Sequence, residues 1–589
     1  MRAPMRRALR ALVFAGVLAF CGTAFAARPI ELRLIGINDF HGNLEASGLG
    51  LVLNDPRGGA ALQVPAGGAA ALAGMVHALR ATAPHTLTLS AGDLVGAAPL
   101  ISTLFRHEST ISVMNAIGLD AAAVGNHEFD AGIVELRRLQ SGGCLATEAQ
   151  DVIGSCRLEP YTGAKFAMLA SNVLDARRQA AMAPYVIKRV AGIPVGIIGA
   201  VTKATPDIVI RSGVAGLRFT DEADGINRAA RELRRRGVRA MIALVHEGGE
   251  LGVAQRRGDW NDANCLERSG PIFGIAARLV PEISVIFSGH THQGYRCVMG
   301  GRTIVSATSY GRGISVVDVR IDPRTRRIMP ALTTGYNLPV LNDSSDPAVR
   351  ERLAAHAPAP YAAVLRTATP DPDIARQVAR YAAAVAATAD RQVGTVQGHF
   401  GRTGESDSAA GRLIADAQLA ATRAPSQGGA QIAFTNKGGI RSDLGCGEAA
   451  PSPCALTFGQ VFAMQPFGNS LVVMTLTGAQ LKALLESQDR GGDLKIMSPS
   501  AGFMYAFRKS AVAGDRVRDM QLEGEAVVPD HEYRVTVNSF MAEGGDGFGT
   551  LVEGKNRFAA GRDLDALLKF LKPPAVRSPT AASRVTLQP

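Results

Sequence analysis

The chain has 589 residues, of which 47% are hydrophobic and 20% are charged. This composition excludes a wholly disordered or low-complexity protein, and the length predicts two to four domains that each bury a core. The net charge is +11, and no dense basic run is interleaved with aromatic residues. The charge therefore favours anionic small molecules as partners, and we expect no nucleic acid polymer.

The first 26 residues predict a secretory signal peptide. Four arginines precede an apolar run over residues 11–20, and the small residues Ala24 and Ala26 mark a cleavage site. The alternative, a stable membrane anchor, needs a longer run. A bulky residue before Cys21 disfavours a lipoprotein signal. Cleavage would lower the net charge by four, to +7. The signal peptide predicts a periplasmic or secreted protein.

Six cysteines remain beyond residue 26, and six cysteines allow 15 pairings. An exported protein meets an oxidising compartment, so disulfides are expected. Sequence proximity favours the pairs Cys144–Cys156, Cys265–Cys297 and Cys446–Cys454. The alternative, a zinc site built from thiolates, lacks a C-x-x-C cluster.

The chain as a whole predicts an α/β fold. Between residues 30 and 321, short apolar runs alternate with amphipathic stretches. The predicted strands of this part are 32–37, 86–89, 121–124, 195–198, 241–245 and 284–287, and its predicted helices include 69–79 and 222–236. Further on, we expect helices at 411–422 and 478–487 and strands at 431–435 and 470–476.

Composition shifts divide the chain into segments. After the signal peptide (1–26), we expect a catalytic domain over 28–341, a linker over 342–391, a second α/β or α+β unit over 392–573, and a frayed polar tail over 574–589. Within the linker, residues 346–356 predict a short helix. Asp371 and Pro372 are a favourable N-cap and first residue for a second helix that ends near residue 388.

Five of the eleven histidines follow predicted strands, in loops that also carry Asp, Asn or Gly. These loops contain Asp39 and His41, then Asp93, then Asn126 and His127, then His246, and finally His290 and His292. Because ligands gather at the carboxyl ends of strands in α/β sheets, we expect the loops to converge. Asp, Asn and His suit borderline divalent ions. On extended backbone, Asp39 and His41 would point the same way, as would His290 and His292.

Taken in this order, these loops resemble those of the calcineurin-like metallophosphoesterases. Three later segments, 434–441, 465–469 and 544–548, resemble the substrate-domain loops of the 5′-nucleotidases. The resemblance covers nearly the whole mature chain and indicates the exported 5′-nucleotidase family, which includes UDP-sugar hydrolases and 2′,3′-cyclic phosphodiesterases. It implies a layered metallophosphoesterase β-sandwich flanked by helices, followed by a smaller C-terminal α/β domain.

The resemblance implies two divalent metal ions, such as Zn, Mn or Co. One ion would bind Asp39, His41 and His292, and the other would bind Asn126, His246 and His290, with Asp93 as the bridge. Two such ions lower the pKa of a shared water and clamp the attacking and leaving oxygens. The expected reaction is release of phosphate from nucleoside 5′-phosphates by a bridging hydroxide.

The resemblance also places His127 at the phosphate, with Asp130 holding its ring. A carboxylate partner favours the imidazolium form, which stabilises charge on the phosphoryl group. The alternative role for Asp130 is to cap the helix that follows. The reactions left open are hydrolysis of UDP-sugars or of 2′,3′-cyclic nucleotides. A binding protein without activity would not need every ligand and also His127 with Asp130. We expect a monomer that binds a nucleotide.

The C-terminal half of the chain would determine the substrate specificity. Phe467 and Phe548 resemble two rings that sandwich the base, although packing in a core is the usual fate of Phe. The other implied substrate residues are Arg441 at the phosphate, Asn436 nearby, Gly438 and Gly439 for close approach of backbone, and Arg402 and Arg412 as further candidates. The roles of the last two depend on how the family motif is aligned with this segment. The motif fits at Glu405 with an insertion or at Asp407 without one, and we prefer the alignment at Asp407.

Overall fold

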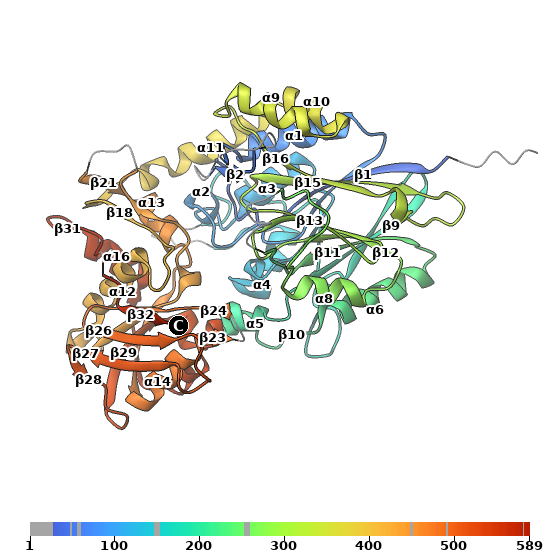
Figure 1. Ribbon diagram of the computed structural model, residues 1–589. Coiled ribbons are helices and arrows are strands. Elements are labelled where there is room, and N and C mark those ends of the chain that lie inside the picture. Colours follow the sequence, from blue (N-terminus) through green and yellow to red (C-terminus); the bar gives the residue numbers. More distant parts are fainter. Residues whose placement is uncertain are drawn as a thin grey trace, which may run out of the picture.

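The computed structural model describes residues 28–46, 50–55, 61–146, 154–252, 259–447, 452–490, 493–580 and 582–589 (Figure 1). The predicted signal peptide and Cys21 lie outside these described residues.

Two six-stranded sheets form the N-terminal half. The first has the order β16 (Thr334–Pro339), β15 (Gly313–Ile321), β1 (Ile30–Ile37), β4 (Thr86–Ser90), β5 (Ala121–Ala123) and β6 (Ala167–Leu169). The second has the order β13 (Gly294–Met299), β14 (Arg302–Ala307), β12 (Ile283–Ser288), β11 (Ala240–His246), β9 (Ile193–Val201) and β8 (Tyr185–Val190). The predicted strands are therefore confirmed. β1, β4, β5 and β6 run parallel, as do β9, β11, β12 and β14.

The two sheets pack face to face, and helices cover their outer sides. Leu34 and Leu89 of the first sheet share a buried core with Leu244 and Phe287 of the second. The covering helices are α1 (Ala69–Ala81), α3 (Glu108–Ile117) and α4 (Gly132–Ser141) on the first sheet, and α6 (Glu222–Arg235) and α8 (Pro271–Arg278) on the second. The shorter elements are α2 (Leu100–Thr103), α5 (Thr205–Ile208), β2 (Leu51–Leu53), β3 (Leu62–Val64), β7 (Val173–Leu174) and β10 (Arg218–Phe219). This is the expected layered β-sandwich flanked by helices.

The segment predicted as a linker is helical. It forms α9 (Pro347–His356), α10 (Ala359–Thr367) and α11 (Pro372–Ala389), and the carboxylate of Asp371 caps α11 as expected. Apolar side chains of α10 and α11, including Tyr361 and Tyr381, join the core of the N-terminal half. The segment is therefore packed along its length, and in Figure 1 α11 leads towards the C-terminal half.

Beside two short two-stranded sheets, β18 (His399–Phe400) with β20 (Leu444–Gly445) and β23 (Asp489–Arg490) with β24 (Asp493–Leu494), the described residues of the C-terminal half form three larger sheets. The first larger sheet has the order β25 (Ser498–Pro499), β19 (Ile432–Thr435), β29 (Glu532–Asn538), β22 (Ser470–Thr477) and β30 (Lys555–Arg562). The second has the order β28 (Glu525–Ala526), β27 (Val517–Leu522), β26 (Phe503–Arg508) and β32 (Val585–Gln588). The third has the order β21 (Cys454–Thr457), β17 (Gln392–Val396) and β31 (Val576–Arg577). The main helices are α12 (Ala409–Thr422), α13 (Phe458–Met464), α14 (Gly478–Glu486), α15 (Ser539–Ala542) and α16 (Asp563–Leu571).

The prediction of a frayed tail over 574–589 is wrong. β31 pairs with β17, and β32 pairs with β26. The guanidinium of Arg584 donates to both carboxylate oxygens of Asp416, at 2.7 and 2.8 Å. The tail therefore closes two sheets of the C-terminal half.

The three predicted disulfides, Cys144–Cys156, Cys265–Cys297 and Cys446–Cys454, are confirmed. Within the described part of the chain, none of the helices has the length and apolar character that crossing a membrane requires.

Candidate active site

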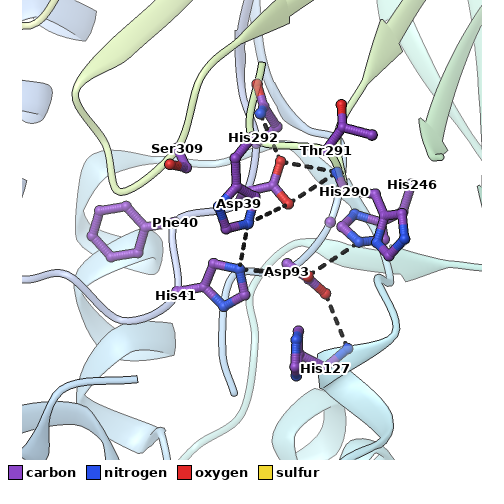
Figure 2. A network of polar contacts seen from close by, with 12 residues as sticks. Asp39, Phe40, His41, Asp93, His127, His246, His290, Thr291, His292 and Ser309 are labelled. Atoms are coloured by element: carbon purple, nitrogen blue, oxygen red, sulfur yellow. Dashed lines mark hydrogen bonds and ion pairs between the residues drawn. The ribbon is translucent and has the colours of Figure 1, made fainter. Parts of the chain in front are cut away.

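The five predicted loops converge at one end of the sandwich, although more than 250 residues separate the first from the last (Figure 2). Nε2 of His246 lies 3.1 Å from Oδ2 of Asp93, and Nε2 of His41 lies 3.5 Å from the same oxygen. Nε2 of His292 lies 3.5 Å from Oδ1 of Asp39. Three groups of side chains have ligand atoms within 4.8 Å of one another: Asp39, His41 and His292; His41, Asp93 and His127; and Asp93, His246 and His290.

The backbone that presents these side chains is not extended, which corrects the geometric argument made from the sequence. Five of the residues have a left-handed backbone: Asp39 (φ 49°), His41 (φ 47°), Asp93 (φ 51°), His290 (φ 73°) and His292 (φ 57°). Asn126 is right-handed helical, with φ −69° and ψ −36°. The side chains therefore converge through tight turns. Residues held in such sparsely populated conformations cluster at functional sites.

Backbone carbonyls orient two of the imidazoles. Nδ1 of His41 lies 2.8 Å from the carbonyl oxygen of Gly96, and Nδ1 of His246 lies 2.8 Å from that of Ala91. A ring that donates its Nδ1–H in this way turns its Nε2 towards the cluster, which is how histidine ligands of metals are held in place. Nε2 of His246 also lies 3.1 Å from Oδ1 of Asn126.

The electrostatics of the cluster suit bound cations. Burial raises the pKa of Asp39 to about 7 and lowers that of His41 and of His290 to about 3. Burial alone would also lower the pKa of His246, but Asp93 raises it to about 10. Buried carboxylates next to the imidazoles of His41 and His290, which are neutral at pH 7, form a donor set for divalent ions. The residues present therefore fit the metal ions that the family resemblance implies.

The carboxylate of Glu128 ties two of the loops together. It accepts hydrogen bonds from the backbone N–H groups of Asp93 (3.0 Å), Leu94 (2.7 Å) and Gly125. Any Cβ at Gly125 would lie only 2.0 Å from Oδ1 of Asp93, so this position requires glycine. Sequence reasoning missed the role of Glu128, although its place after Asn126 and His127 was visible.

His127 lies beside the cluster with its predicted partner. Its Nδ1 is 2.8 Å from Oδ2 of Asp130, and its ring stacks on Phe467 at 5.8 Å between centroids. Burial alone would lower the pKa of His127, but Asp130 and Asp93 raise it above its usual value. The ring can therefore carry a positive charge at the mouth of the cluster.

A cavity of about 330 Å³ joins the two halves of the chain at this point. His127, Asp130, Asn126 and His290 line it from the N-terminal half, and the C-terminal half contributes the predicted residues Asn436, Gly438, Gly439, Arg441 and Phe467. It also contributes residues that were not selected from the sequence, among them Lys495, Asn538, Phe540 and Asp546. The cavity therefore opens from the metal-ligand cluster to the predicted substrate loops.

A family model described as "5′-nucleotidase, C-terminal domain" matches residues 385–553. The structure of a 5′-nucleotidase precursor from Thermus thermophilus superposes with a TM-score of 0.71 and 26% identity, over 95% of this chain and 100% of that one. The chain belongs to the 5′-nucleotidase family.

Two curated relatives extend the likeness over more than 90% of this chain. A probable 5′-nucleotidase of Treponema pallidum (strain Nichols) is 27% identical over 93% of this chain and 92% of that protein. The endonuclease YhcR of Bacillus subtilis (strain 168) is 29% identical over 92% of this chain. The chain spans only 40% of the length of YhcR. As a member of this family of phosphoesterases, the chain is an enzyme.

The structure corrects one predicted aromatic ring of the substrate region. Phe548 is only 1% exposed and belongs to the hydrophobic core of the C-terminal half. The ring that lines the cavity with Phe467 is Phe540, eight residues earlier and at the start of α15. The glycine-rich segment at 544–547 was a correct signal for this region, but it identified the wrong phenylalanine.

The three predicted arginines of the substrate region have different surroundings. Arg441 lines the cavity, its guanidinium lies 5.7 Å from the centroid of the Phe467 ring, and its buried Nε has no hydrogen-bond partner among the described residues. Arg402 donates a hydrogen bond of 3.0 Å to the carbonyl oxygen of Arg441 and does not itself line the cavity. Arg412 pairs with Asp407 at 3.2 Å and donates to Thr580 of the tail, so the structure does not support a phosphate contact there.

Proposed function

We propose that this enzyme is exported and releases phosphate from nucleoside 5′-phosphates with the help of two divalent metal ions. The observation that carries the proposal is the cavity that joins the cluster of metal-ligating side chains to the substrate loops. Export is supported by the three disulfides and by the predicted signal peptide.

Seven side chains would hold the ions: Asp39, His41 and His292 at one, Asn126, His246 and His290 at the other, and Asp93 at both. When bound, such ions supply an activated water and neutralise charge on the phosphoryl oxygens. A carboxylate shared by both ions would offset their mutual repulsion, and Asp93 contacts residues of both sets.

The remaining cavity residues would hold and orient the nucleotide. His127, kept positive by Asp130, would donate to a phosphoryl oxygen and stabilise its developing charge. Arg441 would pair with the phosphate through its planar fork. Phe467 and Phe540 would contact the two faces of the base, which tolerates any nucleobase because every base has a stacking face. Asn436 and Asp546, joined by a hydrogen bond of 2.7 Å, would bind the sugar.

The second candidate is a nucleotide that contains a diphosphate, such as a UDP-sugar. It is favoured by one observation, a second cation in the cavity at Lys495. Nothing comparable favours a 2′,3′-cyclic nucleotide.

The direct test is release of inorganic phosphate from 5′-AMP by the purified mature chain. We expect rapid release that EDTA abolishes and that added Mn²⁺ or Zn²⁺ restores. If the metal-loaded protein does not hydrolyse any nucleotide in a panel of AMP, ADP, UDP-glucose and 2′,3′-cyclic AMP, the proposal is wrong.

A further inference from the structure

Lys495 lies in the cavity next to Asp546. It sits between β24 (Asp493–Leu494) and β25, and its Nζ is 3.5 Å from Oδ1 of Asp546. The other carboxylate oxygen of Asp546 accepts the hydrogen bond of Asn436, whose own oxygen accepts a hydrogen bond from Asn538 at 3.1 Å. This chain of contacts fixes Asp546, and Asp546 in turn holds the ammonium group in the cavity.

The two permanently charged cations of the cavity lie at separate places in it. Arg441 lies beside the ring of Phe467, whereas Lys495 lies beside Asp546. The proposed metal ligands Asn126 and His290 line the same cavity. Arg441 and Lys495 therefore carry their charges on two different walls of the cavity that reaches the metal-ligand cluster.

A nucleoside monophosphate would need only one of these cations. With its phosphate at the metal ligands, His127 and Arg441 would already provide positive charge beside it. The ammonium of Lys495 would then face the sugar together with Asp546. Its side chain is only 38% exposed, so its charge is less screened than that of a surface lysine.

We infer that Lys495 is a specificity-determining residue, which pairs with the inner phosphate of a nucleoside diphosphate while the terminal phosphate occupies the metal-ligand cluster. The inference rests on the proposed function and narrows its substrate class. In this reaction a water oxygen bonds to the terminal phosphorus, and the water releases a proton to solvent. The bond from that phosphorus to the bridging oxygen breaks, and the nucleoside monophosphate leaves with that oxygen and its electron pair. Ammonium–phosphate pairs of this kind are charge-assisted and strong.

The test compares ADP with AMP in the metal-loaded full chain, by initial rates of nucleotide loss on HPLC. We expect Lys495→Met to lower kcat/KM for ADP by about 10- to 100-fold, the range of a lost charged hydrogen bond, and for AMP by less than about threefold. Lys495→Arg keeps the charge and should retain most activity on ADP. The matched control is Lys509→Met, which removes an exposed lysine at the end of β26.

Two outcomes overturn the inference. Equal losses for ADP and AMP would give Lys495 a general role in holding Asp546, and unchanged rates for both would give it none. Near-ultraviolet circular dichroism of each variant shows whether the cavity has kept its structure, and the activity of Lys495→Arg separates charge from packing. If the wild-type chain hydrolyses neither ADP nor AMP, the proposed function fails, whereas hydrolysis with an unchanged ADP-to-AMP ratio in Lys495→Met overturns this inference alone.

Discussion

Nδ1 of His127 lies 2.8 Å from Oδ2 of Asp130, and the same imidazole stacks on Phe467 of the C-terminal half. The carboxylate fixes one edge of the ring, and the phenylalanine covers one face. The contact between the two halves of the chain therefore falls on the side chain that would touch the phosphate.

Asp130→Asn should lower kcat on AMP by about 10²-fold and leave KM nearly unchanged, because it removes the negative charge that keeps His127 positive in the transition state. Steady-state kinetics check this expectation, with Asp343→Asn, an exposed carboxylate in the turn before α9, as the control. A loss in Asp130→Asn that comes entirely from KM would contradict the role given to the pair.

The metal sites can be counted directly. Elemental analysis by mass spectrometry should find two divalent ions per wild-type chain, about one in His292→Ala, and fewer than one in Asp93→Ala, because Asp93 contacts both ligand sets. His356→Ala, which removes an exposed histidine of α9, is the matched control and should keep both ions. Equal metal content in Asp93→Ala and the wild type would rule out the bridging role.

The two phenylalanines of the substrate region should behave differently. Phe540→Ala should raise KM for AMP by about 10-fold or more without changing Tm, because it removes a stacking face from the cavity. Phe548→Ala should instead destabilise the C-terminal half by about 3–5 kcal/mol, because it empties a buried position. Thermal melts and KM values on both variants decide this, and the opposite pattern would restore Phe548 as the stacking ring.

The tail should contribute to stability through Arg584. Arg584→Met leaves the partly buried Asp416 without its bidentate partner and should cost about 1–3 kcal/mol of unfolding free energy. The control is Arg376→Met, which breaks an exposed ion pair with Asp373 and should change stability by less than about 0.5 kcal/mol. Equal denaturation midpoints for both variants would mean that the tail is only loosely attached.

Asp563 should make the C-terminal half less stable as the pH rises. Burial raises the pKa of this carboxyl to about 7 in the folded chain, against about 4 when unfolded. Between these values the folded state binds more protons than the unfolded state, so stability falls from about pH 4 and continues to fall until the folded group has ionised above pH 7. Asp563→Asn should therefore gain Tm relative to the wild type at pH 8 and not at pH 4. A difference in Tm that does not vary with pH would contradict the buried protonated carboxyl.

Much of the fold could be predicted from the sequence because its signals are local. Runs such as β11 and β12 are apolar on both faces, as buried parallel strands are, and Asp371 with Pro372 marks the start of α11. The loops that carry the proposed metal ligands could be selected for a related reason, since each follows the end of such a strand.

Other features depend on contacts that no short segment reveals. The left-handed backbone of Asp39 and His41 is imposed by the loops around them, and an Asp-x-His segment reads equally well as extended chain. The choice between Phe540 and Phe548 depends on how α15 and the following turn direct each ring. The tail looked unstructured because it is polar, but β31 and β32 find their partners in strands far away along the chain.

The residues around the cavity form two sets, and each half of the chain supplies one of them. The proposed metal ligands lie on loops of the N-terminal core, and the residues that would distinguish one nucleotide from another lie on loops of the C-terminal core. Substitutions in the C-terminal loops would therefore alter which ester is accepted and leave the proposed metal ligands in place. Exchanging residues 436–441 and 495 between relatives is accordingly a direct way to move substrate preference from one of these proteins to another.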